Sequence, residues 1–156
     1  MGAMFRFECS LPMNAPVASV WERLIDFPGI PTWEGGVLEV RQISPGPPGI
    51  GTELVARRVY GGRESTVDCR ITAWEEGHAA TMSIRGGPIR EASVRYAVEP
   101  AADGRALVSY SAAGEFRGAW GLLTHLAGAM GRKQVRSNLD RLKRQVEGSA
   151  APRHRA

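Results

Sequence analysis

WGLLTHLAGAMGRKQVRSNLDRLKRQVE, residues Trp120 to Glu147, is predicted to form one long helix, and this segment decides the fold. Its second half carries apolar residues at helical spacing with charges between them: Val135, Leu139, Leu142 and Val146. Its first half is interrupted by glycines, each of which costs roughly 1 kcal/mol relative to alanine, so this half needs packing. A long helix after a run of strands implies a curved sheet that grips the helix, and the space between them is either a core or a pocket.

The residues before this helix predict seven strands and two short helical segments. Apolar and polar side chains alternate over 5–11, which is the period of a half-buried strand. Asn14 is expected to cap a short helix with Pro16 in its first turn. That helix must end by Phe27, because Pro28 disfavours helical geometry in the residue before it. Gly- and Pro-rich turns then separate six antiparallel strands, expected at 37–43, 52–60, 64–74, 78–84, 89–99 and 106–116.

The prediction is therefore one α+β domain over residues 5–147, followed by a disordered basic tail at 148–156. A curved antiparallel seven-stranded sheet is expected to wrap around the long C-terminal helix, with two short helices after the first strand. At 156 residues, such a domain can bury a hydrophobic core without disulfides or metal ions to stabilise it.

Composition narrows the function classes. The chain is 43% hydrophobic and 23% charged, with a net charge of +4. Most of the excess cations fall on the terminal helix and the tail, where a solvated helix face explains them, so we expect no nucleic-acid partner. No apolar run approaches the roughly 18 residues of a membrane span, and the first residues lack the apolar core of a signal peptide. We expect a cytoplasmic protein without an integral membrane segment.

Metal, cofactor and nucleophilic chemistry find no pattern in the sequence. The two cysteines, Cys9 and Cys69, lie in predicted strands and are expected to be small buried side chains. The three histidines are scattered, and neither a phosphate-binding loop nor a nucleophile elbow is present. We expect no cofactor and no metal site.

Three stretches resemble one family. They are VWERLIDFPGIPTWEGGVLEV at 20–40, GIGTELVARR at 49–58 and YAVEPAADGRALVSY at 96–110. The first is similar to the opening of the START-type helix-grip (SRPBCC) superfamily, in particular its polyketide cyclase/dehydrase-like branch; the matching positions are Val20, Trp21, Leu24, Asp26, Pro31, Trp33, Gly36 and Val37. The resemblance covers residues 5–147. It implies a deep cavity between the concave sheet and the last helix, in a superfamily that includes lipid and sterol carriers, quinone-binding proteins and aromatic polyketide cyclases.

Strand alternation predicts which side chains face the last helix. The expected inward sets are Phe5/Phe7/Cys9/Leu11, Leu38/Val40, Leu54/Ala56/Arg58/Tyr60, Val67/Cys69/Ile71, Met82/Ile84, Ala92/Val94/Tyr96/Val98 and Val108/Tyr110/Ala112. Most are apolar, as either a core or a lipid pocket requires. The polar exceptions are Arg58 and the three tyrosines.

Each polar candidate has two interpretations. A buried Arg58 would need a ligand head group or an acid such as Glu34, but a bulge that turns it to solvent is the interpretation we favour. The tyrosines either donate hydrogen bonds to a ligand or bury their rings in the core. Trp33 is either a lid or a plug of the core. Trp120 and Met130 are either gate residues or plain core.

The predicted ligand-binding set combines these residues with their apolar neighbours: Trp33, Leu54, Arg58, Tyr60, Cys69, Met82, Tyr96, Tyr110, Trp120, Leu123, Ala127 and Met130. The catalytic candidates are Arg58, Tyr96 and Tyr110.

Three functions remain open. The leading hypothesis is a monomer or homodimer that binds a hydrophobic small molecule such as a lipid, quinone or polyketide. The second is a cyclase, aromatase or dehydratase in which a Tyr or Arg polarises a carbonyl. The third is a partner-binding protein whose interior is filled.

Overall fold

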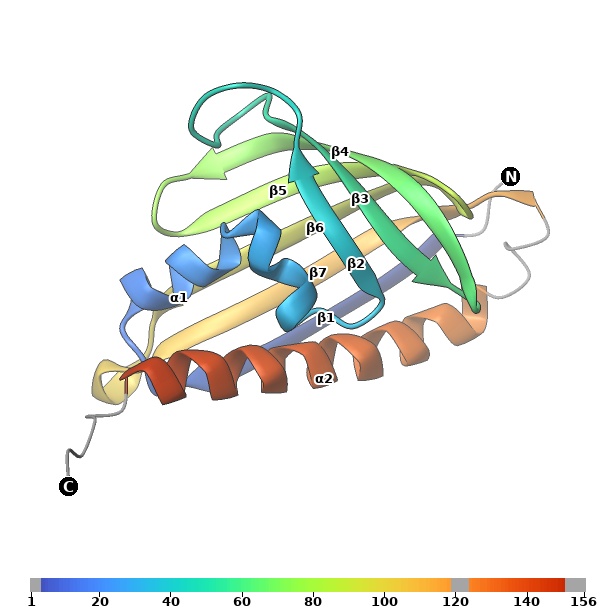
Figure 1. Cartoon of the computed structure of the whole chain (residues 1–156). Coiled ribbons are helices and arrows are strands. Elements are labelled where there is room, and N and C mark those ends of the chain that lie inside the picture. The colour runs from blue at the N-terminus through green and yellow to red at the C-terminus, as the bar shows by residue number, and fades with distance from the viewer. Residues whose placement is uncertain (1–3, 119–123, 151–156) are drawn as a thin grey trace.

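The computed structural model describes residues 4–118 and 124–150 (Figure 1). In chain order, the elements are β1 (Met4–Met13), α1 (Val17–Leu24), the 3-10 helix η1 (Phe27–Thr32), β2 (Val37–Gln42), β3 (Glu53–Tyr60), β4 (Arg63–Glu75), β5 (Ala79–Gly86), β6 (Ile89–Pro100), the short 3-10 helix η2 (Ala102–Gly104), β7 (Ala106–Phe116) and α2 (Thr124–Ala150).

The strands form one seven-stranded antiparallel sheet with the order β1-β7-β6-β5-β4-β3-β2. The first strand pairs with the last, so the meander closes back on β1 and leaves β1 and β2 as the two edges. The sheet curves, and α2 runs along its concave side next to β1 (Figure 1). Helix α1 contacts β6, and η1 contacts β2. This arrangement confirms the predicted helix-grip fold.

The prediction of inward-facing side chains from strand alternation is confirmed on six of the seven strands. The exception is β2, where Leu38 is 45% exposed and Val37 is buried in its place. The register of β2 against β3 shifts between Val37 and Glu39, which is a β-bulge. Because a bulge inserts one residue, it reverses the inward and outward faces on one side of it.

Two predictions at the ends of helices are wrong. Asn14 does not cap α1: the N-cap is Pro16, without a side-chain hydrogen bond. The backbone N–H of Asn14 instead donates to Glu147 Oε1 at 2.9 Å, and Lys143 Nζ donates to the same oxygen at 2.7 Å. These contacts hold the last turns of α2, which continues to Ala150, so residues 148–150 are helical rather than a disordered tail. The rest of the predicted tail lies outside the described residues.

The glycine-rich part of α2 lies against β1. A methyl group at Gly131 would come within 2.5–3.0 Å of the Phe7 ring, and one at Gly128 would lie 3.4 Å from the carbonyl oxygen of Arg6. Glycine therefore lets the helix approach the edge strand closely, which supplies the packing that this half of the helix needs. The predicted helical residues 120–123 lie outside the described part of the chain.

Candidate ligand-binding site

A cavity of about 410 Å³ lies between α2 and the sheet. Its lining residues come from β1, from the segment before β2, from β3 and β7, from two turns and from α2: Phe7, Glu34, Gly35, Gly36, Arg58, Val59, Tyr60, Gly61, Pro88, Tyr110, Phe116, Met130, Gly131, Gln134, Val135 and Asn138. Of these described residues, only Glu34 and Arg58 carry a formal charge. A second cavity of about 170 Å³ shares Arg58, Tyr60 and Tyr110 with it and is otherwise lined by apolar residues.

Arg58 points into the interior, which corrects the interpretation that a bulge turns it to solvent. The register of β3 against β4 is regular through Arg58, and the bulge lies in β2 instead. The Arg58 side chain is 20% exposed and its Nη2 lies 3.7 Å from Glu34 Oε1. The guanidinium carbon also lies 5.6 Å from the centre of the Tyr60 ring, within range of a cation–π contact. The acid expected to meet an inward Arg58 is the one that does so.

Glu34 is held on its other oxygen as well. Its side chain is 3% exposed, and the Tyr96 hydroxyl donates to Glu34 Oε2 at 3.3 Å. A buried carboxylate needs such partners because burial without them is costly. One carboxylate oxygen therefore faces Arg58 and the other faces Tyr96.

Asn138 fixes the backbone that carries Glu34. Its Oδ1 accepts hydrogen bonds from Gly35 N at 3.0 Å, from Gln134 Nε2 at 3.0 Å and from Arg141 Nη2 at 2.6 Å. Arg141 Nε also donates to the Trp33 carbonyl at 2.9 Å. A Cβ at position 35 would lie 2.6 Å from both Arg141 Nη2 and Gln134 Nε2, so any larger residue would push the ends of these two side chains aside. These contacts clamp the segment before β2 onto α2.

Sequence reasoning missed Asn138. Its position in the sequence could have indicated that it is buried, because it stands beside Leu139 on the apolar stripe of α2 between Val135 and Leu142. A buried amide at such a position requires hydrogen-bond partners.

The tyrosine hydroxyls in this cluster hold their protons. Burial is the largest cause that raises the pKa of Tyr60, of Tyr96 and of Tyr110, and it does so most strongly for the latter two. Burial by itself would lower the pKa of Arg58, but the neighbouring Glu34 carboxylate, with smaller effects from the tyrosines, reverses this and raises it. Around the cavity, Arg58 is a cation and the tyrosines are neutral groups able to donate hydrogen bonds.

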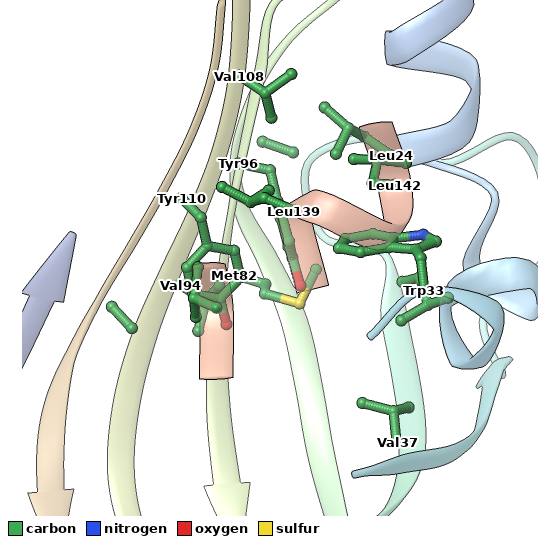
Figure 2. Close-up of a cluster of buried hydrophobic side chains, with 14 of the residues drawn as sticks. Leu24, Trp33, Val37, Met82, Val94, Tyr96, Val108, Tyr110, Leu139 and Leu142 are labelled. Atoms are coloured by element: carbon green, nitrogen blue, oxygen red, sulfur yellow. The ribbon is translucent and has the colours of Figure 1, made fainter. Parts of the chain in front are cut away.

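Trp33 is a plug of the core rather than a lid. It is 1% exposed, and its ring meets Tyr96 edge-on at 6.2 Å between centroids. Figure 2 shows its indole facing Leu139 and Leu142 of α2. Trp33 therefore packs in the core next to Tyr96 and does not line the 410 Å³ cavity.

Four other predicted ligand residues lie deeper. Leu54, Cys69, Met82 and Tyr96 surround a void of about 20 Å³, which Glu34 and Arg58 also line. Because a water molecule needs about 10–15 Å³, this void is too small for an organic ligand. Burial raises the pKa of the Cys69 thiol to about 11, as expected for a core cysteine.

On α2, Met130 is 67% exposed and lines the cavity, so it is not plain core. The exposed residues Val59 and Gly61 line the cavity together with it. Trp120 and Leu123 lie outside the described residues, as does the side chain of Ala127.

Among the described residues, no group of three or more His, Cys, Asp or Glu side chains could hold a metal ion. None of the described helices is both long and apolar enough to cross a membrane.

The sheet, the gripping helix and the cavity between them define a helix-grip protein with a largely apolar interior site. The chain belongs to the family described as "Polyketide cyclase / dehydrase and lipid transport", which it matches over residues 4–147. This confirms the resemblance drawn from residues 20–40.

Solved structures agree on the fold. The Zhui aromatase/cyclase from Streptomyces sp. R1128 has a TM-score of 0.80 at 14% identity, covering 98% of this chain and 99% of that one. TTHA0849 from Thermus thermophilus has a TM-score of 0.75 at 16% identity, covering 94% and 99%. Ara h 8.0201 has a TM-score of 0.69 at 20% identity, also covering 94% and 99%. No curated protein sequence matches the chain.

Proposed function

We propose that this protein binds a hydrophobic small molecule that carries a hydrogen-bonding oxygen, with the apolar part in the 410 Å³ cavity and the oxygen at Arg58. The observation that carries this proposal is the position of Arg58, which lines both that cavity and the adjoining one of about 170 Å³. Among the described residues that line this mostly apolar site, Arg58 is the one that carries a positive charge.

The size and lining of the cavity support a small organic ligand. Ligand pockets are typically about 300–1,000 Å³, with mainly apolar walls and a few convergent polar groups. Each Å² of apolar ligand surface removed from water contributes about 25 cal/mol, while Arg58, Tyr60 and Tyr110 supply donors that orient a polar atom.

The family and its relatives point the same way. The family description names lipid transport beside polyketide cyclisation, and one similar structure is that of an aromatase/cyclase. Both activities require an apolar molecule to enter the fold. An interior already filled by side chains, on which the partner-binding hypothesis depends, does not fit a cavity of this size.

Binding is tested by titrating the purified protein with an uncharged environment-sensitive dye such as Nile red, then adding a fatty acid, a quinone or an aromatic polyketide as competitor. We expect saturation at one dye per chain and displacement by one class. Gln134→Trp should block binding, because Gln134 is exposed and lines the cavity. Ser137→Trp is the matched control, since Ser137 is exposed on the same helix but does not line the cavity. Saturable binding that survives Gln134→Trp unchanged would place the ligand elsewhere.

A second candidate function is polyketide cyclisation, favoured by the presence of Arg58 and Tyr110 on the same cavity wall. Two donors on one carbonyl oxygen draw electron density from the carbonyl carbon, so that an enol carbon of the same chain can attack it. The new C–C bond replaces the C–O π bond, and the former carbonyl oxygen takes up the proton that the enol hydroxyl gives up as it becomes a ketone. Tyr96 instead acts through Glu34 and positions it. If cyclised product forms at an undiminished rate in the triple variant Arg58→Ala, Tyr96→Phe, Tyr110→Phe, these residues have no catalytic role.

A further inference from the structure

The Glu34–Arg58 pair gives the cavity wall a cation whose charge is already matched. Arg58 lies 3.7 Å from a carboxylate that is almost fully buried. In the described part of the chain, no other residue that lines the 410 Å³ cavity carries a formal charge. The wall thus offers donors to a ligand oxygen without a net positive charge.

Glu34 is not free to swing away and release Arg58 to an anionic ligand. Tyr96 binds the second carboxylate oxygen, and Asn138 holds the next residue's backbone through Gly35 N at 3.0 Å. Breaking these contacts would leave buried polar groups without partners, which is costly. A ligand carboxylate at Arg58 would therefore have to lie beside the Glu34 carboxylate.

We propose that Glu34 is a specificity-determining residue that makes the cavity select uncharged oxygen-bearing ligands, such as ketones, quinones or esters, and reject carboxylates. This inference rests on the proposed ligand-binding function. A ketone oxygen accepts a hydrogen bond from Arg58 without disturbing the ion pair. For a carboxylate, attraction to Arg58 and repulsion from Glu34 nearly cancel, so the loss of its hydration is not compensated.

The size of the effect follows from Coulomb's law. Two like charges about 5 Å apart at an effective dielectric constant of about 20 repel by an amount that lowers affinity on the order of 100-fold. Neutralising Glu34 removes this repulsion and leaves the attraction to Arg58, so carboxylate affinity should rise by about that factor relative to a ketone.

The test uses two probes of one shape, 2-acetonaphthone and 2-naphthoate, each measured by displacement of Nile red at pH 7. The wild-type protein should bind the ketone at least about ten times more tightly. Glu34→Gln keeps an oxygen able to accept the Tyr96 hydrogen bond and should shift the ratio toward the carboxylate on the order of 100-fold. Glu39→Gln is the matched control, because Glu39 pairs with Arg57 at 2.9 Å on the outer face of the neighbouring strand, and it should leave the ratio unchanged.

Equal wild-type affinities for the two probes would overturn the inference, and this comparison holds even if Glu34→Gln does not fold. An unchanged ratio in folded Glu34→Gln would overturn it as well. In both cases the probes bind, so the proposed function survives. If neither the dye nor the probes bind to the folded wild-type protein, the proposed function fails and the inference fails with it.

Discussion

Replacing Asn138 by alanine tests the clamp that holds the polar side of the cavity. The change removes one acceptor that serves three donors, on Gly35, Gln134 and Arg141. Gln134 is exposed and can turn to water, and Arg141 keeps its bond to the Trp33 carbonyl. The main losses are the backbone N–H of Gly35 and part of the Arg141 bonding.

An unsatisfied buried donor costs about 1–3 kcal/mol. Since the Gly35 donor is lost in full and the Arg141 donor in part, we expect Asn138→Ala to lower the free energy of unfolding by about 2–4 kcal/mol. For a domain of this size that corresponds to a fall in Tm of about 4–16 °C. Because Glu34 loses its backbone anchor, ligand affinity should fall as well, in a folded protein below its Tm.

Urea unfolding followed by circular dichroism measures the stability, and dye titration measures the binding. Asn138→Asp keeps an acceptor at the same place and pairs with Arg141, so it should lose less than half as much stability. Ser137→Ala, at an exposed neighbouring position, controls for a helix substitution. A loss below about 0.5 kcal/mol in Asn138→Ala, which is the range of ordinary surface changes, would refute the clamp.

Three further predictions concern close packing and protonation. Gly131→Ala should destabilise by about 1–3 kcal/mol through overlap with the Phe7 ring, whereas Gly148→Ala, with nothing within 4 Å of the added carbon, should be neutral or stabilising; equal Tm values would contradict this. Burial raises the pKa of all three tyrosines, so folding favours their protonated forms. Their contribution to stability should therefore be full below about pH 10 and be lost as the pH rises above it. Phenolate absorbance that appears near pH 10 before the protein unfolds would contradict this prediction. Cys69, whose pKa is raised to about 11, should resist iodoacetamide at pH 8 in the folded protein, while the half-buried Cys9 reacts faster; mass spectrometry of the labelled peptides decides.

The sheet was predictable because strand alternation is a local property. Each strand was expected within two residues of its observed bounds, and the inward sets followed from the alternation of side chains. The single failure, Leu38, arose from a bulge whose extra residue leaves no mark in the pattern of β2. The N-cap expected at Asn14 failed for a different reason, since its backbone is bound by Glu147 from the far end of the chain.

The site was predictable only in part. Parity alone put Arg58, Tyr60 and Tyr110 on the inner face, and the structure brings them to one cavity. The same parity placed Leu54, Cys69 and Met82 on that face, but they fill the core behind the ion pair. Alternation tells which face a side chain is on and not how far along the strand the helix leaves a gap.

The sequence by itself determined the fold class and the inward face of six of the seven strands, because hydrophobic periodicity and turn residues act over a few positions, and the resemblance of residues 20–40 indicated the family. Only the tertiary structure decided that Arg58 is paired, that Trp33 is a plug and that Asn138 joins α2 to the segment before β2. These outcomes depend on contacts between residues about 25 to 110 positions apart, whose geometry is set by the curvature of the sheet and the close approach of α2 to β1.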